Sequence, residues 1–153
     1  MGAGTTSDGE ECLLSATTVR RDDGGDMRTH AVAVLVVDDQ APFRSVARMV
    51  VGMTPGFEVV AEADTGEAAV AAAVTSTPDV VLMDINLPGI SGIEATRKIL
   101  AARPNTLVIL LSTYGVEDLP KEAGDCGAAR YVNKEDFEPS VLTDTWEARQ
   151  HVG

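Results

Sequence analysis

The chain has few cysteines, few aromatic residues and no long hydrophobic run. Its two cysteines, Cys12 and Cys126, match no disulfide framework or cysteine metal site, which favours the reducing cytoplasm as its compartment. The longest apolar run, residues 31–37, is far shorter than the roughly 20 residues that cross a bilayer. Aromatic residues make up 4% of the sequence, which suits helices packed on a buried sheet better than a β-sandwich. The sequence therefore argues against a disulfide-rich secreted domain and against a membrane protein.

Basic residues are also scarce, since 12 Lys and Arg stand against 24 Asp and Glu and the formal net charge at pH 7 is −12. Residues 1–30 carry six acids and three bases, so the rest of the chain carries 18 acids and nine bases, a net charge of −9. Binding DNA requires a basic surface that neutralises phosphates. We therefore expect no nucleic acid as a direct partner.

The chain divides into a polar leader and one domain. Residues 1–30 are rich in Gly, Asp, Thr and Ser without hydrophobic periodicity, which predicts a disordered leader. Beyond them, apolar runs predict strands at residues 33–37, 57–61, 80–83, 107–111 and 130–132. Helical periodicity predicts helices at residues 42–53, 66–76, 91–102, 116–125 and 136–150. This alternation predicts an α/β domain over residues 31–150, with a doubly wound, five-stranded parallel sheet and five helices.

Polar side chains follow four of the five expected strands within two positions. They are Asp38 and Asp39 after the first strand, Asp84 after the third, Ser112 and Thr113 after the fourth, and Lys134 after the fifth. The carboxyl ends of parallel strands meet at one edge of the sheet, where ligands of such folds bind. We therefore expect these side chains to share one site.

A site with three carboxylates needs a cation. At an effective dielectric constant of about 20, each pair of carboxylates about 4 Å apart costs roughly 4 kcal/mol, which protonation or a cation must offset. Oxygen ligands without a nearby His or Cys favour Mg²⁺. Taken singly, Asp38 or Asp39 could be a helix cap, Asp84 a turn residue and Lys134 a solvated surface charge. Their joint placement favours the site.

Four motifs in this order resemble the receiver domain of response regulators in two-component signalling. They are VVDD at residues 36–39, LMDINLPGISG at 82–92, LLST at 110–113 and GAARYVNK at 127–134. The resemblance covers residues 33–147 and implies the flavodoxin-like strand order 2-1-3-4-5. It also implies a module that catalyses only its own phosphorylation and dephosphorylation, and is otherwise no enzyme.

The resemblance implies a role for each residue of the site. Asp84 corresponds to the phosphoacceptor, which receives a phosphoryl group from a sensor histidine kinase. Asp39 corresponds to a direct Mg²⁺ ligand, Asp38 to a ligand acting mainly through water, and the backbone carbonyl of Asn86 to a further ligand. Lys134 corresponds to the cation that pairs with the phosphoryl oxygens.

Two further residues correspond to the family's switch. Ser112 lies 22 residues before Lys134, the usual family spacing, and is therefore preferred to Thr113 as the switch hydroxyl. Tyr131 corresponds to the aromatic residue that turns inward on activation. We expect the output surface on the face formed by residues 116–125, 130–132 and 136–150. An unknown downstream protein would bind there, and a homodimer through that face stays open.

The sequence departs from the family in two respects. Glu135 follows the lysine where the family usually has a proline, commonly with a cis bond, so we expect a trans or strained loop. The lysine, glutamate and aspartate at 134–136 resemble the subgroup joined to helix-turn-helix output domains. Only 19 residues follow Lys134, too few for such a domain, so the chain is expected to be a single-domain regulator or a truncated relative of those factors.

Two other functions stay open. A Mg²⁺-dependent phosphatase with an aspartyl nucleophile would need a general acid two positions after Asp84, where Asn86 cannot serve. The second is a binding module that keeps the receiver fold without phosphorylation. No residue favours this alternative, because the site positions all carry competent side chains.

Overall fold

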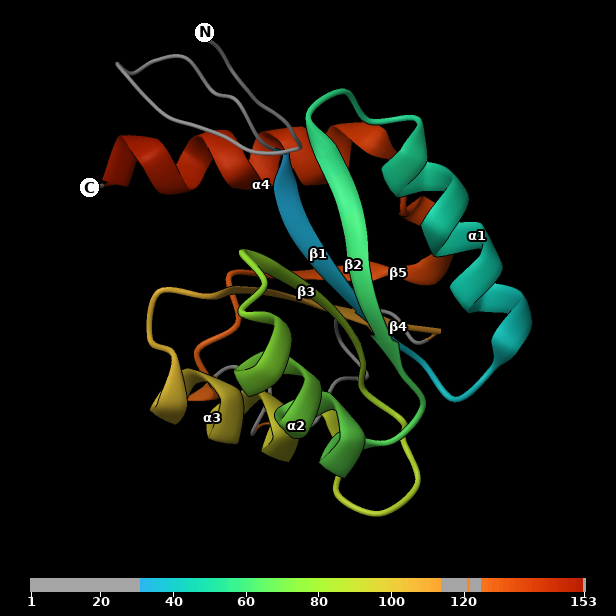
Figure 1. The fold of residues 1–153 in the computed structure, drawn as a ribbon, viewed down its shortest axis with the longest axis vertical. Helices are drawn as coiled ribbons and strands as arrows, with labels where there is room; N and C mark the ends of the chain where they lie inside the picture. Colours follow the sequence, from blue (N-terminus) through green and yellow to red (C-terminus); the bar gives the residue numbers. More distant parts are fainter. Residues whose placement is uncertain (1–30, 114–120, 122–124, 153) are drawn as a thin grey trace, which may run out of the picture. The chain divides into compact units, whose positions relative to one another are not determined.

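The computed structural model describes residues 31–113, 121 and 125–152, which form one parallel sheet covered by helices (Figure 1). The strands are β1 (Val32–Val37), β2 (Phe57–Ala63), β3 (Val80–Asp84), β4 (Leu107–Ser112) and β5 (Arg130–Asn133). All neighbouring pairs are parallel, in the order β2-β1-β3-β4-β5. The predicted sheet and its strand order are confirmed.

The described residues contain four α-helices and one 3₁₀ turn rather than five helices. The helices are α1 (Ala41–Gly52), α2 (Gly66–Ser76), α3 (Gly92–Ala102) and α4 (Pro139–Val152), and the 3₁₀ turn spans Lys134–Asp136. The helix expected over residues 116–125 lies mostly outside the described residues, and the leader expected over residues 1–30 lies wholly outside them. The last helix begins three residues later than expected, because Phe137 is extended and Pro139 starts the helix.

Helices cover both faces of the sheet and create two apolar cores. On one face, α1 and α4 pack against side chains that include Val34, Leu82 and Ile109. On the other face, α2 and α3 pack against a second set that includes Leu35 and Met83 (Figure 1). Strands β1, β3 and β4 are therefore buried on both sides, which explains their continuous apolar sequences.

Side-chain caps fix the starts of two helices. The hydroxyl of Thr65 accepts a hydrogen bond from the backbone N–H of Ala68 at 3.0 Å, so Thr65, rather than Asp64, caps α2. Ser91 caps α3 in the same way through the backbone N–H of Glu94. These caps place the helix starts within one residue of the prediction.

The buried face of α1 is rotated relative to the prediction. The helical spacing of Phe43, Val46, Ala47 and Val50 in the sequence predicts that Val46 faces the core, but Val46 is 45% exposed, whereas Val51 is completely buried beside Ala47 and Val50. Phe43 lies at the start of the helix and packs against the same core. The helix therefore contacts the sheet through a stripe that begins at Phe43 and ends at Val51.

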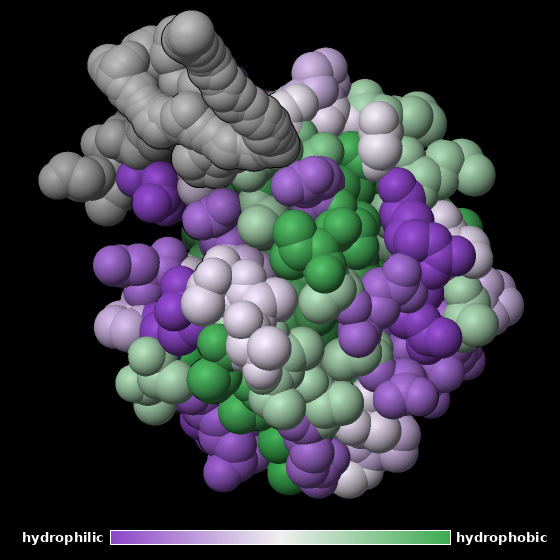
Figure 2. Space-filling model, viewed as in Figure 1, coloured by the Kyte–Doolittle hydropathy of each residue, from purple (hydrophilic) through white to green (hydrophobic). Residues whose placement is uncertain are grey.

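Large exposed apolar side chains occur on α1 and its C-cap, at Val46, Met49 and Met53, and singly on β2 and α2, at Val60 and Val74. Val60 is an extra residue in β2, since Val34 pairs with Val59 and Leu35 pairs with Ala61. Such a bulge disrupts the free edge of a sheet and discourages pairing with another chain. Apolar surface is visible over β2, bordered by polar side chains (Figure 2). Within the described residues, none of the helices is long and apolar enough to span a membrane.

Candidate functional site

The loop after β1 holds Asp38 completely buried and leaves Asp39 exposed. One carboxylate oxygen of Asp38, Oδ1, accepts a hydrogen bond from the backbone N–H of Gln40 at 2.8 Å. The backbone carbonyl of Asp38 accepts a 2.7 Å hydrogen bond from the guanidinium of Arg44, on the first turn of α1. Asp38 is thus held through one oxygen of its side chain and through its backbone carbonyl.

Asp84 is the last residue of β3 and is 4% exposed. Its Oδ1 accepts a hydrogen bond from the backbone N–H of Asn86 at 3.2 Å. Gly92 lies directly behind this loop, where its N–H donates to the carbonyl of Ile85 at 2.9 Å. A Cβ atom at Gly92 would overlap the backbone carbonyl of Asp84, so the turn after β3 requires glycine there.

Lys134 directly follows β5 and directs its ammonium group toward the acids. Its Nζ lies 2.6 Å from Oδ2 of Asp38 and 3.6 Å from Oδ2 of Asp84. The face of the Phe43 ring covers the same ammonium, with its centroid 4.7 Å away. No peptide bond among the described residues is cis, so the bond between Lys134 and Glu135 is trans. The structure thus places the lysine in the site without the family's proline.

The three carboxylates of Asp38, Asp39 and Asp84 have oxygen atoms that lie within 4.8 Å of one another. Burial raises the pKa of Asp84 to about 6, with further contributions from the charges of Asp38 and Asp39. Lys134 and the N–H of Asn86 lower that pKa only in part. A positive charge beyond that of Lys134 would therefore stabilise the ionised site.

The donor set fits a hard divalent cation. Oδ2 of Asp38 is buried and accepts no hydrogen bond of good geometry, although Lys134 lies 2.6 Å away. Buried polar atoms are rarely left in this state, and the bound water of a hydrated metal ion would donate a hydrogen bond to this one. Carboxylate oxygens without sulfur or imidazole ligands suit Mg²⁺. The site is thus chemically consistent with Mg²⁺, which would be held by Asp38, Asp39 and Asp84.

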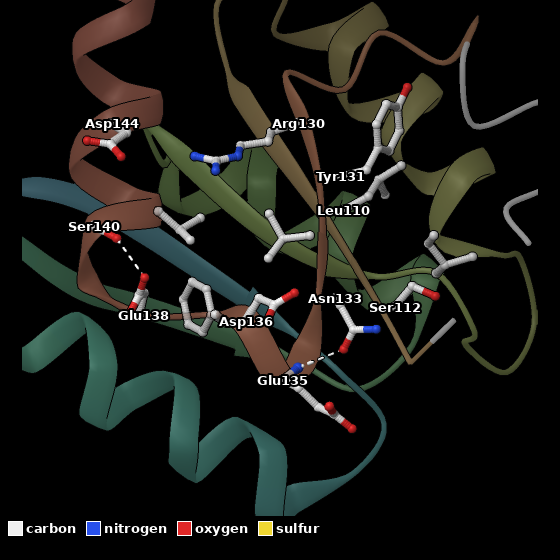
Figure 3. Close-up of a pocket in the computed structure, with 14 residues that line it drawn as sticks. Leu110, Ser112, Arg130, Tyr131, Asn133, Glu135, Asp136, Glu138, Ser140 and Asp144 are labelled. Carbon is white, nitrogen blue, oxygen red and sulfur yellow. Dashed lines mark hydrogen bonds between the residues drawn. The ribbon is translucent and has the colours of Figure 1, made fainter. Parts of the chain in front are cut away.

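Ser112 and Tyr131 lie along a groove on the outer edge of the sheet. Ser112 ends β4, is buried, and pairs in register with Asn133. Ser112 and Tyr131 both line a cavity of about 840 Å³ that follows β5 toward α4. The Tyr131 ring points away from Ser112 (Figure 3). Burial raises the pKa of the Tyr131 hydroxyl above its ordinary value. Ser112 on β4 and Tyr131 on β5 thus line the same groove from adjacent strands.

This groove is acidic. Glu135, Asp136, Glu138 and Asp144 contribute carboxylates to its lining, and Arg130 contributes the one guanidinium (Figure 3). None of these four carboxylates forms an ion pair with another described residue. The guanidinium of Arg130 donates a 3.3 Å hydrogen bond to the hydroxyl of Thr145. The edge of the sheet therefore presents net negative charge.

The family model of the response regulator receiver domain matches residues 34–146, which include every side chain of the site. The chain belongs to this family. Receivers are signalling modules of two-component systems rather than enzymes, and histidine kinases phosphorylate them. This membership confirms the expectation that the chain is not an enzyme and argues against the phosphatase alternative.

Two curated response regulators are similar to this chain over their receiver parts. The receiver is 38% identical over 104 residues to the transcriptional regulatory protein DegU of Brevibacillus brevis, covering 68% of the chain and 44% of DegU. It is 41% identical over 103 residues to the response regulator UvrY of Escherichia coli K12, covering 67% of the chain and 47% of UvrY. The chain spans less than half the length of these two relatives.

A solved structure supports the resemblance to regulators joined to helix-turn-helix output domains. The receiver resembles a LuxR-family two-component response regulator from Aurantimonas sp. SI85-9A1, with a TM-score of 0.69 and 33% identity over 77% of this chain and 84% of that one. The predicted resemblance to regulators linked to helix-turn-helix domains is therefore confirmed for the receiver part. The similarity concerns that part alone.

The structure adds residues to the site that the sequence did not single out. Arg44 and Phe43 on α1 contact Asp38 and Lys134, and the side chain of Asn133 caps the 3₁₀ turn after the lysine. Phe43 packs against the apolar core beneath α1, as its helical spacing predicts, and in addition contacts Lys134. The polar Asn133 beside Lys134 was the one available signal, because Asn often caps the turn that follows it.

Proposed function

We propose that the chain accepts a phosphoryl group on Asp84 from a sensor histidine kinase in the cytoplasm, with Mg²⁺, and thereby switches a protein-binding face. The observation that carries the proposal is the arrangement of Asp38, Asp39 and Lys134 around Asp84. Family membership supports both the reaction and the compartment. Burial and the charges of Asp38 and Asp39 make the ionised form of Asp84 unfavourable, so a positive charge beside Asp84 would stabilise that form.

In the proposed reaction, a carboxylate oxygen of Asp84 attacks phosphorus while the bond between phosphorus and the donor's leaving group breaks. With a pKa of about 6, Asp84 is mostly ionised at pH 7 and is available as the nucleophile. Lys134, 3.6 Å from Asp84, donates hydrogen bonds to the phosphoryl oxygens. When bound, Mg²⁺ supplies positive charge that offsets the charge on those oxygens.

The proposed metal ligands differ in burial. Asp39 is exposed and free to bind the ion directly, whereas the buried Asp38 already holds the N–H of Gln40 and the ammonium of Lys134. This difference supports direct binding by Asp39 and binding mainly through water by Asp38. The backbone carbonyl of Asn86 is the proposed further ligand.

The proposed switch runs from Ser112 to Tyr131. Phosphorylation of Asp84 would add nearly two negative charges, and the Ser112 hydroxyl would move to donate to them. Tyr131 would follow, changing the groove that both residues line. We propose the face of β5 and α4, with residues 116–125, as the output surface for a downstream protein or a second copy of the chain. Direct nucleic acid binding is not part of the proposal, because this face is acidic.

The experiment is labelling of the full chain by a small phosphodonor with Mg²⁺. We expect Asp84→Asn to abolish labelling and Lys134→Ala to slow it by roughly tenfold or more, since a charge-assisted contact to the phosphoryl group is lost. Lys98→Ala is the matched control, because it removes an exposed ammonium on α3 that pairs only loosely with Glu94 at 3.9 Å. Equal labelling of Asp84→Asn would overturn the proposal.

The binding-module alternative has its own readout. Asp84→Ala would leave affinity for the downstream protein unchanged with or without the phosphodonor if phosphorylation played no part. The proposal predicts that the phosphodonor changes the affinity of the unsubstituted chain and not that of the variant.

A further inference from the structure

The side chain of Phe43 lies against the ammonium of Lys134. The distance from Nζ to the ring centroid is 4.7 Å, within the range of a cation–π interaction. The Lys134 side chain is 12% exposed, so little water competes for its charge. Desolvated cations gain most from such contacts, because the negative face of the ring replaces part of the lost hydration.

Phe43 is held in place at the start of α1. Pro42 occupies the first turn of the helix, and the N–H of Phe43 donates to the carbonyl of Gln40 at 3.1 Å. The next residue, Arg44, binds the backbone carbonyl of Asp38. The backbone that carries the ring is therefore held next to the loop of Asp38, which the lysine faces.

The same ring also supports the loop that follows the lysine. Its centroid lies 6.4 Å from that of Phe137, with the two planes tilted by 48°. Between Lys134 and Phe137, the 3₁₀ turn is capped by Asn133, whose side chain accepts the N–H of Glu135 at 2.9 Å. Phe43 thus contacts both the charge of Lys134 and the residue at which the turn ends.

We propose that Phe43 is the positioning residue for Lys134 in this chain, where Glu135 stands in place of the family's proline. The aromatic face and Phe137 hold the ammonium over Asp38 and Asp84. The inference rests on the proposed function for its effect on phosphorylation, but the contact itself is testable separately. Phe43 touches no reacting atom and acts through Lys134.

The first test compares phosphorylation rates of the full chain with a small phosphodonor and Mg²⁺. Phe43→Leu keeps an apolar side chain and removes the ring, and we expect labelling roughly threefold to tenfold slower. Phe43→Tyr keeps the ring and is expected to retain most of the labelling rate of the unsubstituted chain. A trifluorinated phenylalanine at this position keeps the shape while weakening the negative face, and is expected to slow labelling as well.

A double-substitution cycle identifies the route of the effect. In a Lys134→Met background, labelling is slow and Phe43→Leu is expected to cause no further loss, because the partner charge is absent. An equal loss in both backgrounds would overturn the proposal. So would a slow Phe43→Leu variant with an unaffected fluorinated one, since packing alone would then explain the rate.

An NMR measurement separates this inference from the proposed function. The ring should shift the Cε proton signals of Lys134 upfield, and Phe43→Leu should abolish that shift while Phe43→Tyr retains it. Unshifted lysine protons in the unsubstituted chain would overturn the contact. If the chain accepted no phosphoryl group, the proposed function would be wrong. The NMR signal would still show whether the Phe43 ring lies against Lys134.

Discussion

The carboxylate of Asp84 sits in a position where its own charge is unfavourable. It is 4% exposed and shares the site with Asp38 and Asp39, which together with burial raise its pKa to about 6. Because the ordinary value is 3.8, the folded chain binds a proton at this residue more tightly than the unfolded chain. Ionised Asp84 therefore lowers the stability of the metal-free fold.

The sign of this effect gives a stability prediction. In the presence of EDTA, the free energy of unfolding of Asp84→Asn should exceed that of the unsubstituted chain by roughly 1–3 kcal/mol at neutral pH. The difference should grow as the pH rises from about 4 and should level off above about 6, where Asp84 is ionised in both states. Urea denaturation of both chains across this pH range measures it. A less stable Asp84→Asn at neutral pH would contradict the electrostatic account.

Single residues of the site differ in how far the sequence predicts them. Asp38, Asp84 and Lys134 could be predicted because each lies at or just beyond the carboxyl end of an expected strand, and the strand ends of a parallel sheet share one edge. Phe43 could not, because its sequence signal is that of any apolar residue on a helix. Its contact with Lys134 depends on the crossing of α1 over the sheet, which no local pattern specifies.

The turn between β3 and α3 depends on the absence of a side chain at Gly92. Gly92→Ala would drive a methyl group into the carbonyl of Asp84. We expect this variant to lose roughly 1–3 kcal/mol of stability and to be phosphorylated more slowly, because Asp84 must move. Denaturation and labelling by a small phosphodonor measure the two effects.

Gly52→Ala is the matched control for this element. Gly52 ends α1, and a Cβ atom there would meet no other atom within 4 Å. Alanine should therefore be neutral or stabilising by up to about 1 kcal/mol, without any change in labelling. Equal behaviour of the two alanine variants would show that the close approach behind Asp84 is unimportant.

Element boundaries could be predicted where local chemistry sets them. Thr65 and Ser91 cap their helices through their own hydroxyl groups, so those starts are visible in the sequence. The start of α4 at Pro139 was not, because the 3₁₀ turn after Lys134 and the burial of Phe137 delay it. Tertiary packing decided that boundary.

At the scale of the whole molecule, the parallel sheet gathers acids from separate loops into a chain that is already strongly acidic, with a formal net charge of −12. Repulsion of this kind destabilises a compact state, and a bound cation relieves it locally. The parallel sheet and the location of the site at its edge could be predicted from the apolar runs and the residues that follow them, and the strand order from the resemblance to receiver domains. The acidic groove along β5 could not, because it combines side chains from the loop and from α4.

Mg²⁺ should therefore stabilise the fold. At a concentration about tenfold above its Kd, the expected gain in the free energy of unfolding is about 1.4 kcal/mol, seen as a shift of the urea midpoint. Asp39→Asn should lose most of this gain. Glu58→Gln, which removes an exposed acid from β2, should keep it. An equal response to Mg²⁺ in all three chains would argue against the proposed ligands.

The identity of the phosphorylated residue is the most direct test of the account. After incubation with Mg²⁺ and a small phosphodonor, borohydride reduction converts an aspartyl phosphate into homoserine, which peptide mass spectrometry can locate. The account predicts homoserine at position 84 and at no other aspartate. Phosphate retained on Ser112 or Thr113, reduction at another aspartate, or an unmodified chain would contradict it.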